Sequence, residues 1–207
     1  MVVLSKYAKS DRGSIVLIGP TGVGKSAVGK VLANMLSWPL IELDELRSSW
    51  YPEFGLDPQA ERAAMEQGGL LELVAAWKPY ELQSVERVMR ENPTNTVIAF
   101  GGGQSVYVDE SMVARAKTAL ASASKVILML PAEHGEDSMR LLLDRLRTVP
   151  FVTQQANPEE FLRSFQPILK MQLQSASNPA LATEMIVTGQ STPEELARHI
   201  LTTMDES

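Results

Sequence analysis

Eight consecutive residues near the N-terminus have the pattern of a nucleotide phosphate site. The segment Gly19-Pro20-Thr21-Gly22-Val23-Gly24-Lys25-Ser26 fits G-x-x-x-x-G-K-[ST]. Such a loop wraps a β-phosphate with backbone N–H groups, brings a lysine to the β/γ oxygens and offers a hydroxyl to magnesium. Its glycines keep Cβ atoms out of the way of the phosphate. The pattern therefore predicts a site for ATP and Mg²⁺, and its residues are Gly22, Val23, Gly24, Lys25, Ser26 and Ala27.

The segments on either side of this loop are the elements that it requires. Residues 14–18 form an apolar run that fits a buried strand. Residues 25–36 carry apolar side chains at the spacing of one helical face. An ordinary glycine-rich turn is the alternative interpretation of the motif. Because strand, loop and helix come in the required order, the phosphate site is the favoured one.

Two acidic residues, Glu42 and Asp44, form a second candidate site. They lie at the end of the run 40–43, which fits a strand, and an open parallel sheet binds ligands at the carboxyl ends of its strands. Two positions apart in an extended segment, their carboxylates point to the same side. One could hold magnesium through water while the other orients and deprotonates an acceptor hydroxyl. The alternative is that Asp44 caps a following helix and Glu42 is solvated.

Three consecutive glycines, Gly101, Gly102 and Gly103, follow the run 96–100, which fits a third strand. Without side chains, they let a ligand or another backbone approach closely and present N–H donors to an anion. A simple turn at the end of a strand is the alternative. Like the other two sites, this one is expected at the carboxyl end of a strand.

Strand-like and helix-like segments alternate along the chain, which predicts an α/β fold with a mostly parallel sheet flanked by helices. The expected strands are 14–18, 40–43, 96–100, 126–130 and 184–187, and the expected helices are 25–36, 58–67, 80–92, 110–121, 137–147 and 193–204. The last helix has the clearest start, because Thr192 and Glu195 form a capping box around Pro193. We expect one domain over residues 1–207, with an acceptor-binding insertion at 45–79 and a mobile lid at 148–180.

Composition and charge exclude several classes of function. Of the 207 residues, 44% are hydrophobic and 21% charged, as in an ordinary globular domain. The net charge of −6 and the lack of a basic block argue against a nucleic-acid partner. The absence of cysteine rules out a thiolate nucleophile and a Cys-ligated zinc site. Since no apolar run is long enough to span a bilayer, we expect a cytoplasmic protein without a membrane partner, either a monomer or a weak homodimer.

In order and spacing, the three candidate sites resemble those of the shikimate kinases, P-loop enzymes of the nucleoside-monophosphate-kinase-like group. Residues 40–46 look like that family's D-x-D-E stretch, 99–103 like its strand-GGG element, and 182–201 like its last strand, adenine loop and last helix. The resemblance implies a five-stranded parallel sheet of order 2-3-1-4-5. It also implies that Asp44 contacts the acceptor hydroxyl and that Glu42 lies near magnesium.

A lid carrying arginines after the fourth strand is a further implication of the resemblance. Arg140 and Arg147 keep the family's spacing of seven residues, so they are expected to act on the transferring phosphate. Arg145 is a rival candidate. For all three arginines, the alternative is a solvated face of a helix.

The sequence departs from the family where arginines hold the substrate carboxylate. Ungapped counting places Tyr80 or Glu81 at one of these positions and Gln174 at the other. The nearest cations are Lys78 and Lys170, and a lone lysine cannot reproduce the planar bidentate grip of arginine. We therefore expect shikimate to bind weakly. The expected substrate-binding residues are Asp44, Lys78, Gly101, Gly102 and Gly103.

Together, these patterns predict a magnesium-dependent kinase that transfers the γ-phosphoryl group of ATP to a hydroxyl of shikimate or a related small metabolite. Its expected catalytic residues are Lys25, Asp44, Arg140 and Arg147. Two alternatives stay open: a kinase for a hydroxyl compound without a carboxylate, and a non-catalytic nucleotide-binding regulatory protein. The presence of both the phosphate loop and Asp44 favours an enzyme.

Overall fold

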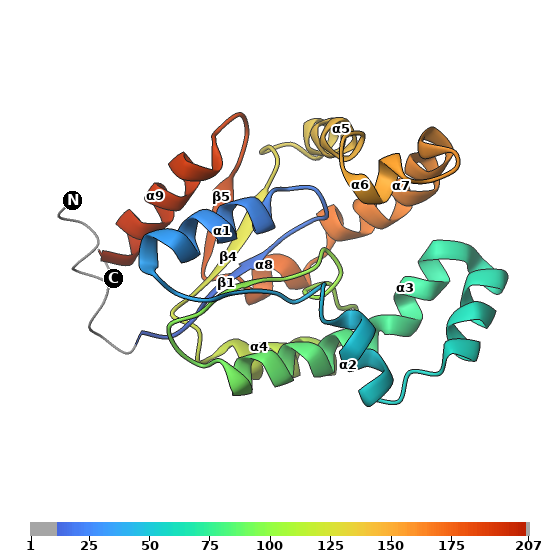
Figure 1. The fold of residues 1–207 in the computed structure, drawn as a ribbon, viewed down its shortest axis with the longest axis horizontal. Helices are drawn as coiled ribbons and strands as arrows, with labels where there is room; N and C mark the ends of the chain where they lie inside the picture. The colour runs from blue at the N-terminus through green and yellow to red at the C-terminus, as the bar shows by residue number, and fades with distance from the viewer. Residues whose placement is uncertain (1–11, 206–207) are drawn as a thin grey trace.

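A computed structural model describes residues 12–205, so both ends of the predicted domain, 1–11 and 206–207, lie outside the described residues. Five parallel strands form one sheet in the order β2-β3-β1-β4-β5 (Figure 1). The strands are β1 (Ile15–Ile18), β2 (Leu40–Glu42), β3 (Val97–Ala99), β4 (Lys125–Leu130) and β5 (Glu184–Val187). The predicted strand positions and the predicted order are confirmed.

Helices cover both faces of the sheet, which explains why its strands are nearly continuous apolar runs. Alternate residues of β1 enter two separate cores: Ile15 and Leu17 pack on one face, and Val16 and Ile18 on the other. The first core is covered by α1 (Lys25–Leu36) and α9 (Pro193–Asp205), and the second by α3 (Pro58–Glu91), α4 (Glu110–Leu120) and α8 (Ser177–Leu181).

The start of α9, which the sequence predicted from its capping residues, is confirmed. In α9, the Glu195 backbone N–H donates to Thr192 Oγ1 at 3.2 Å and the Thr192 N–H donates to Glu195 Oε2 at 2.8 Å, so the predicted capping box is present. The helix that follows the phosphate loop, α1, also begins and ends where the sequence predicted. Among residues 12–205, no helix is both long and apolar enough to cross a membrane.

The insertion after β2 consists of α2 (Arg47–Glu53) and the first half of α3. The two helices predicted at 58–67 and 80–92 are the two ends of α3, which is interrupted at Gly69. That glycine has φ 64° and ψ −149°, a backbone conformation that other residues rarely adopt. As a result, the first part of α3 projects away from the sheet in a different direction from the second part (Figure 1).

The predicted lid region is mostly helical, and its longest helix was missed by the sequence analysis. After α5 (Gly135–Leu146) come α6 (Pro150–Thr153) and α7 (Pro158–Gln174). The Asn157 side chain accepts a hydrogen bond from the Glu160 N–H at 3.3 Å and caps α7. The start Asn157-Pro158-Glu159-Glu160 repeats the signal seen at the start of α9. The segment's richness in Gln, Ser and Asn masked this signal, and its mobility stays a prediction.

A buried polar network joins α8 to the segment that follows the three glycines. The Ser105 hydroxyl donates to Asn178 Oδ1 at 2.7 Å, and the Ser177 hydroxyl donates to the Ser105 carbonyl at 2.6 Å. The Asn178 amide in turn donates to the Gln172 carbonyl at 2.9 Å. Because buried polar groups are costly to leave unpaired, this network fixes the glycine segment against the end of α7.

Candidate active site

The phosphate loop connects β1 to α1 and holds its lysine inward. Gly22 and Gly24 have φ values of 83° and 106°, so both require the left-handed conformations that glycine tolerates. The Lys25 amine is buried and donates to the carbonyls of Gly19 at 2.7 Å and Pro20 at 2.9 Å. The loop's own carbonyls therefore satisfy the lysine and hold it beside the loop.

Burial has a direct electrostatic effect on this lysine. It lowers the pKa of Lys25 to about 8, while the nearby Asp44 carboxylate acts in the opposite direction. Desolvation disfavours the charged ammonium, and a negative group favours it. With this lowered pKa, the Lys25 side chain changes between its charged and neutral forms near pH 8, within the ordinary laboratory range.

Three loops converge on one cavity of about 430 Å³ at the carboxyl edge of the sheet. They are the phosphate loop after β1, the acidic turn after β2 and the glycine segment after β3. The predicted residues that line this cavity are Gly22, Gly24, Lys25, Ser26, Ala27, Glu42, Asp44, Gly101 and Gly102. The structure therefore brings together most of the residues singled out in the sequence, and we call this space the phosphate cavity.

The two acidic residues of the second site have different surroundings. Glu42 ends β2 and pairs with Lys30 at 3.3 Å, with its side chain 17% exposed. Ser26 and Glu42 both line the phosphate cavity, and their hydroxyl and carboxylate are the hard oxygen donors that suit Mg²⁺. Among residues 12–205, no group of three or more acidic or histidine side chains forms a metal site.

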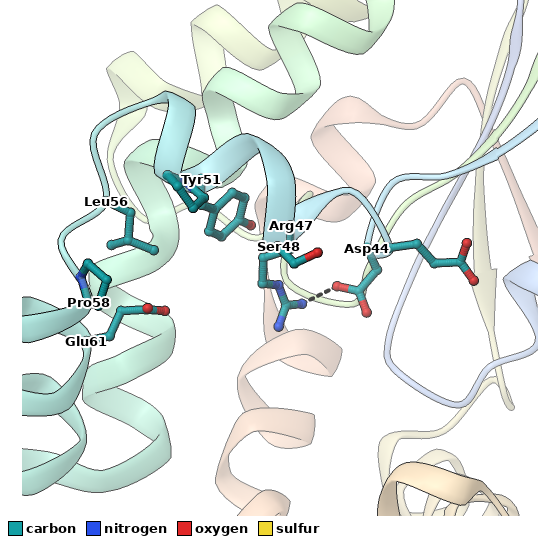
Figure 2. Close-up of a pocket in the computed structure, with 9 residues that line it drawn as sticks. Asp44, Arg47, Ser48, Tyr51, Leu56, Pro58 and Glu61 are labelled. Atoms are coloured by element: carbon teal, nitrogen blue, oxygen red, sulfur yellow. Dashed lines mark hydrogen bonds and ion pairs between the residues drawn. The ribbon is translucent and has the colours of Figure 1, made fainter.

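Asp44 lies in the turn after β2 and forms an ion pair with Arg47. The next helix, α2, begins after Leu46 and has no side-chain cap, so Asp44 does not cap it. Figure 2 shows the Arg47 side chain descending from α2 with its guanidinium directed at the Asp44 carboxylate. The helix-cap alternative for Asp44 is thereby excluded in this structure.

Close approach by neighbouring side chains explains the three glycines. A Cβ on Gly101 would lie 2.7 Å from Asp44 Oδ1, and a Cβ on Gly103 would lie 2.5 Å from Glu81 Oε1. Gly102 is equally restricted, since its Cβ would lie 2.7 Å from the Thr21 backbone nitrogen. The glycines are needed because two carboxylates and the phosphate loop pack directly against this backbone.

Arg47 is the residue of this site that the sequence analysis missed. Besides pairing with Asp44, its guanidinium carbon lies 4.4 Å from the ring centre of Trp77, which is a cation–π contact. Its Nε atom is buried and has no hydrogen-bond partner among the described residues. Its position three residues after Asp44 was a signal that the sequence did contain.

Lys78, the predicted substrate-binding cation, is already engaged by protein groups. Its amine donates to Glu81 Oε2 at 2.6 Å and to the Gly103 carbonyl at 2.8 Å. Glu81 is only 3% exposed, and burial raises the pKa of its carboxyl while Lys78 lowers it. The other predicted cation, Lys170, lines a different cavity together with Gln174. Neither lysine contributes to the lining of the cavity described next.

A second cavity of about 340 Å³ adjoins the phosphate cavity, and both are lined by Thr21, Asp44 and Gly102. We call it the acceptor cavity. The Thr21 N–H donates to Gln172 Oε1 at 2.9 Å, which ties α7 to the phosphate loop at this point. The remaining lining residues are Arg47, Leu70, Val74, Trp77, Glu81, Gly103, Phe151, Phe161, Phe165, Ile168 and Gln172.

The three candidate lid arginines have different positions. Arg140 pairs with Asp137 and has a side chain 71% exposed, and Arg147 pairs with Asp144 and Glu159. Neither of the two lines the phosphate cavity in this conformation. Their predicted role at the transferring phosphate stays a prediction.

Arg145, the rival candidate, points toward the phosphate loop instead. Its guanidinium donates to the Val23 carbonyl at 3.3 Å, to Thr188 Oγ1 at 3.1 Å and to the Gly189 carbonyl at 2.6 Å. It thereby joins the loop to the segment between β5 and α9. A cavity of about 200 Å³ lies there, with Arg145, Val23 and Ala27 in its lining.

The fold and the phosphate loop define a P-loop nucleotide-binding architecture, and solved structures with the same fold include kinases. The chain is similar to shikimate kinase from Acinetobacter baumannii in complex with shikimate, with a TM-score of 0.58, 22% identity and 94% of each chain covered. It is also similar to a gluconokinase from Sinorhizobium meliloti 1021, with a TM-score of 0.57, 19% identity, and 96% and 94% of the two chains covered. These likenesses confirm the fold expected from the resemblance to shikimate kinases.

Sequence comparison gives a partial match. The chain is 30% identical over 109 residues to the pentafunctional AROM polypeptide of Schizosaccharomyces pombe. This match covers 51% of the chain but only 6% of that relative's own length. No known protein-family profile matches the chain.

The lowered pKa of Lys25 predicts proton uptake on nucleotide binding. A bound phosphate favours the ammonium form and raises this pKa, so the protein takes up a proton where the free amine is neutral, above pH 8. For a non-hydrolysable ATP analogue with Mg²⁺, we expect uptake near zero at pH 7 and approaching about one proton at pH 9. Affinity should correspondingly fall as the pH rises through 8.

Calorimetry in buffers of different ionisation enthalpy measures this uptake. Lys25→Arg keeps the charge at all these pH values and should abolish the uptake, whereas Lys117→Ala, an exposed change on α4, should leave it intact. Equal proton uptake at pH 7 and pH 9 in the unaltered protein would contradict the assignment of Lys25.

Proposed function

We propose that this protein is an ATP-dependent small-molecule kinase that transfers the γ-phosphoryl group to a hydroxyl of its acceptor. The observation that supports this most strongly is the position of Asp44, which lines both the phosphate cavity and the acceptor cavity. A hydroxyl bound at Asp44 would face a nucleotide held by the phosphate loop. Positioning of this kind is the main requirement of phosphoryl transfer.

Each residue of the phosphate cavity has a distinct part in the proposed reaction. The loop N–H groups and Lys25 would bind the phosphates and compensate their charge. Ser26 and Glu42 would hold Mg²⁺, which supplies further neutralisation of the phosphate oxygens when bound. Asp44 would accept a hydrogen bond from the acceptor hydroxyl and take its proton.

The lid arginines Arg140 and Arg147 contribute to the proposed reaction only if they leave their present ion pairs. Arg140 is paired with Asp137 of α5, and Arg147, the residue after α5, is paired with Asp144 of α5 and Glu159 of α7, so both would have to leave these carboxylates to reach a transferring phosphate. Arg145 already contacts the phosphate loop, and its three hydrogen bonds suit a role in holding the loop beside the nucleotide.

Shikimate is the reference acceptor by resemblance, but the acceptor cavity disfavours its carboxylate. The family's grip depends on arginines, and here Lys78 is neutralised by Glu81 and Arg47 by Asp44. A carboxylate entering this cavity would have to break one of these pairs. We therefore place a related hydroxyl compound ahead of shikimate itself.

A non-catalytic nucleotide-binding protein is the second candidate function. The acceptor cavity argues against it, because a regulatory module has no need of a carboxylate between a phosphate site and a ligand-sized space. Turnover in the following experiment distinguishes the two candidates.

Replacing Asp44 by asparagine should abolish most phosphoryl transfer. The change keeps the size of the side chain and removes its charge, a role usually worth about 10²–10⁴ in rate. We expect ADP release over a panel of cyclic polyols, sugars, hydroxy acids and uncharged alcohols to fall by that factor, with affinity for ATP nearly unchanged. Glu66→Gln, an exposed change on α3, is the matched control. Activity of Asp44→Asn within about threefold of the unaltered protein would remove Asp44 from the mechanism.

Shikimate binding should be weak and should improve when the Glu81 carboxylate is removed from the cavity lining. In titration calorimetry with ADP and Mg²⁺, we expect a dissociation constant above the millimolar upper end of ordinary KM values. Glu81→Gln removes a carboxylate from the cavity lining and with it the repulsion of an entering carboxylate, so shikimate affinity should rise by about tenfold. Micromolar binding by the unaltered protein would show that its cations are available and would restore shikimate as the acceptor.

A further inference from the structure

The walls of the acceptor cavity are mostly apolar and aromatic. Val74 and Trp77 line it from the second part of α3, and Phe151, Phe161, Phe165 and Ile168 line it from α6 and α7. Most small-molecule pockets use such walls for the body of a ligand and a few polar groups to orient it. A polyol or sugar would leave its hydroxyls unpaired against these walls, which is costly.

Three of these residues form a cluster of their own. Phe151, Phe161 and Phe165 have ring centres 5.8–6.0 Å apart, with edge-on and stacked contacts. Phe151 is 41% exposed although it is a large apolar side chain. An aromatic ring entering the cavity could join this cluster by the same edge and stacking contacts and would cover exposed apolar surface.

The charges in the cavity lining are already balanced in pairs. Arg47 pairs with Asp44, and Glu81 pairs with Lys78 behind the lining. No lining residue of this cavity therefore offers a cation that is free of a carboxylate. An added ligand charge would lack a partner in a largely apolar space, which is strongly unfavourable.

One polar group of the lining has an unused hydrogen-bond donor. Arg47 Nε is buried and has no partner among the described residues. Because this atom has almost no accessible surface, a ligand oxygen would reach it only if the Arg47 side chain shifts. The Asp44 carboxylate, at the junction with the phosphate cavity, is left for the reacting hydroxyl.

We infer that the acceptor is an uncharged hydroxyl compound with an aromatic or comparable apolar ring. The ring lies against Trp77 and the three phenylalanines, and the reacting hydroxyl donates to Asp44. This inference rests on the proposed kinase function, because it names the substrate class of the same site.

Three matched probes test the inference by binding alone. They are 3-phenylpropane-1,2-diol, propane-1,2-diol, which lacks the ring, and 3-phenyllactate, which carries a carboxylate in place of the terminal alcohol. Dissociation constants are measured by ligand-observed NMR with ADP and Mg²⁺ present. Burial of a phenyl ring predicts that the phenyl diol binds at least about tenfold tighter than propane-1,2-diol. An unpaired buried carboxylate predicts a similar advantage over phenyllactate.

Two variants place the binding in the acceptor cavity. Phe151→Ser removes a lining ring and should weaken the phenyl diol by about three- to tenfold. Leu71→Ser removes a similarly exposed apolar side chain on α3 that does not line the cavity, and it should change nothing. Equal effects of the two variants would overturn the inference.

Other outcomes also overturn it: no measurable binding of the phenyl diol, binding of propane-1,2-diol within threefold of it, or binding of phenyllactate as tight or tighter. Addition of ATP separates the inference from the function that it rests on. Ring-dependent binding without ADP release would support the substrate class of the cavity and count against phosphoryl transfer. ADP release with polyols alone would support a kinase and overturn the inference.

Discussion

The whole site depends on the adjacency of β2, β3 and β1 in one parallel sheet. Because parallel strands end at the same edge, this order delivers the acidic turn, the glycine segment and the phosphate loop to one place. The glycines complete the arrangement, since a side chain at 101 or 103 would displace Asp44 or Glu81. Sheet order and glycine packing are thus the two constraints that put a carboxylate beside a phosphate site.

Electrostatic pairing then decides what this shared site can accept. Asp44–Arg47 and Glu81–Lys78 are ion pairs that leave the acceptor cavity without a free cation in its lining. The Lys25 amine, by contrast, donates its hydrogen bonds to neutral loop carbonyls. It can therefore turn to a phosphate without leaving a carboxylate unpaired. The same edge of the sheet therefore has one half with the phosphate loop and one charge-balanced, aromatic half, the arrangement that the proposed transfer from a nucleotide to an uncharged acceptor requires.

The sequence could predict those elements of the fold that depend on residues close together in the chain. The strands, the helix α1 and the capping box of α9 depend on neighbouring residues, and all are confirmed; α7 has the same kind of local start and was overlooked. The pair of Arg47 with Asp44 has a local spacing of three residues that was overlooked, whereas its contact with Trp77, thirty positions away, has no local pattern. The arginines of α5 illustrate helical phase: Arg140 and Arg147 share a solvent face, whereas Arg145, about 140° from Arg140 around the axis, meets the phosphate loop.

The most direct test of this account is to follow the γ-phosphate itself. In ³¹P NMR of ATP and Mg²⁺ with the protein and uncharged aromatic alcohols, we expect a new phosphomonoester resonance that grows as ADP forms. The same resonance should be absent when Asp44 is replaced by asparagine. Formation of orthophosphate alone over the whole panel, or no loss of ATP, would contradict the claim that Asp44 joins a nucleotide site to an acceptor site.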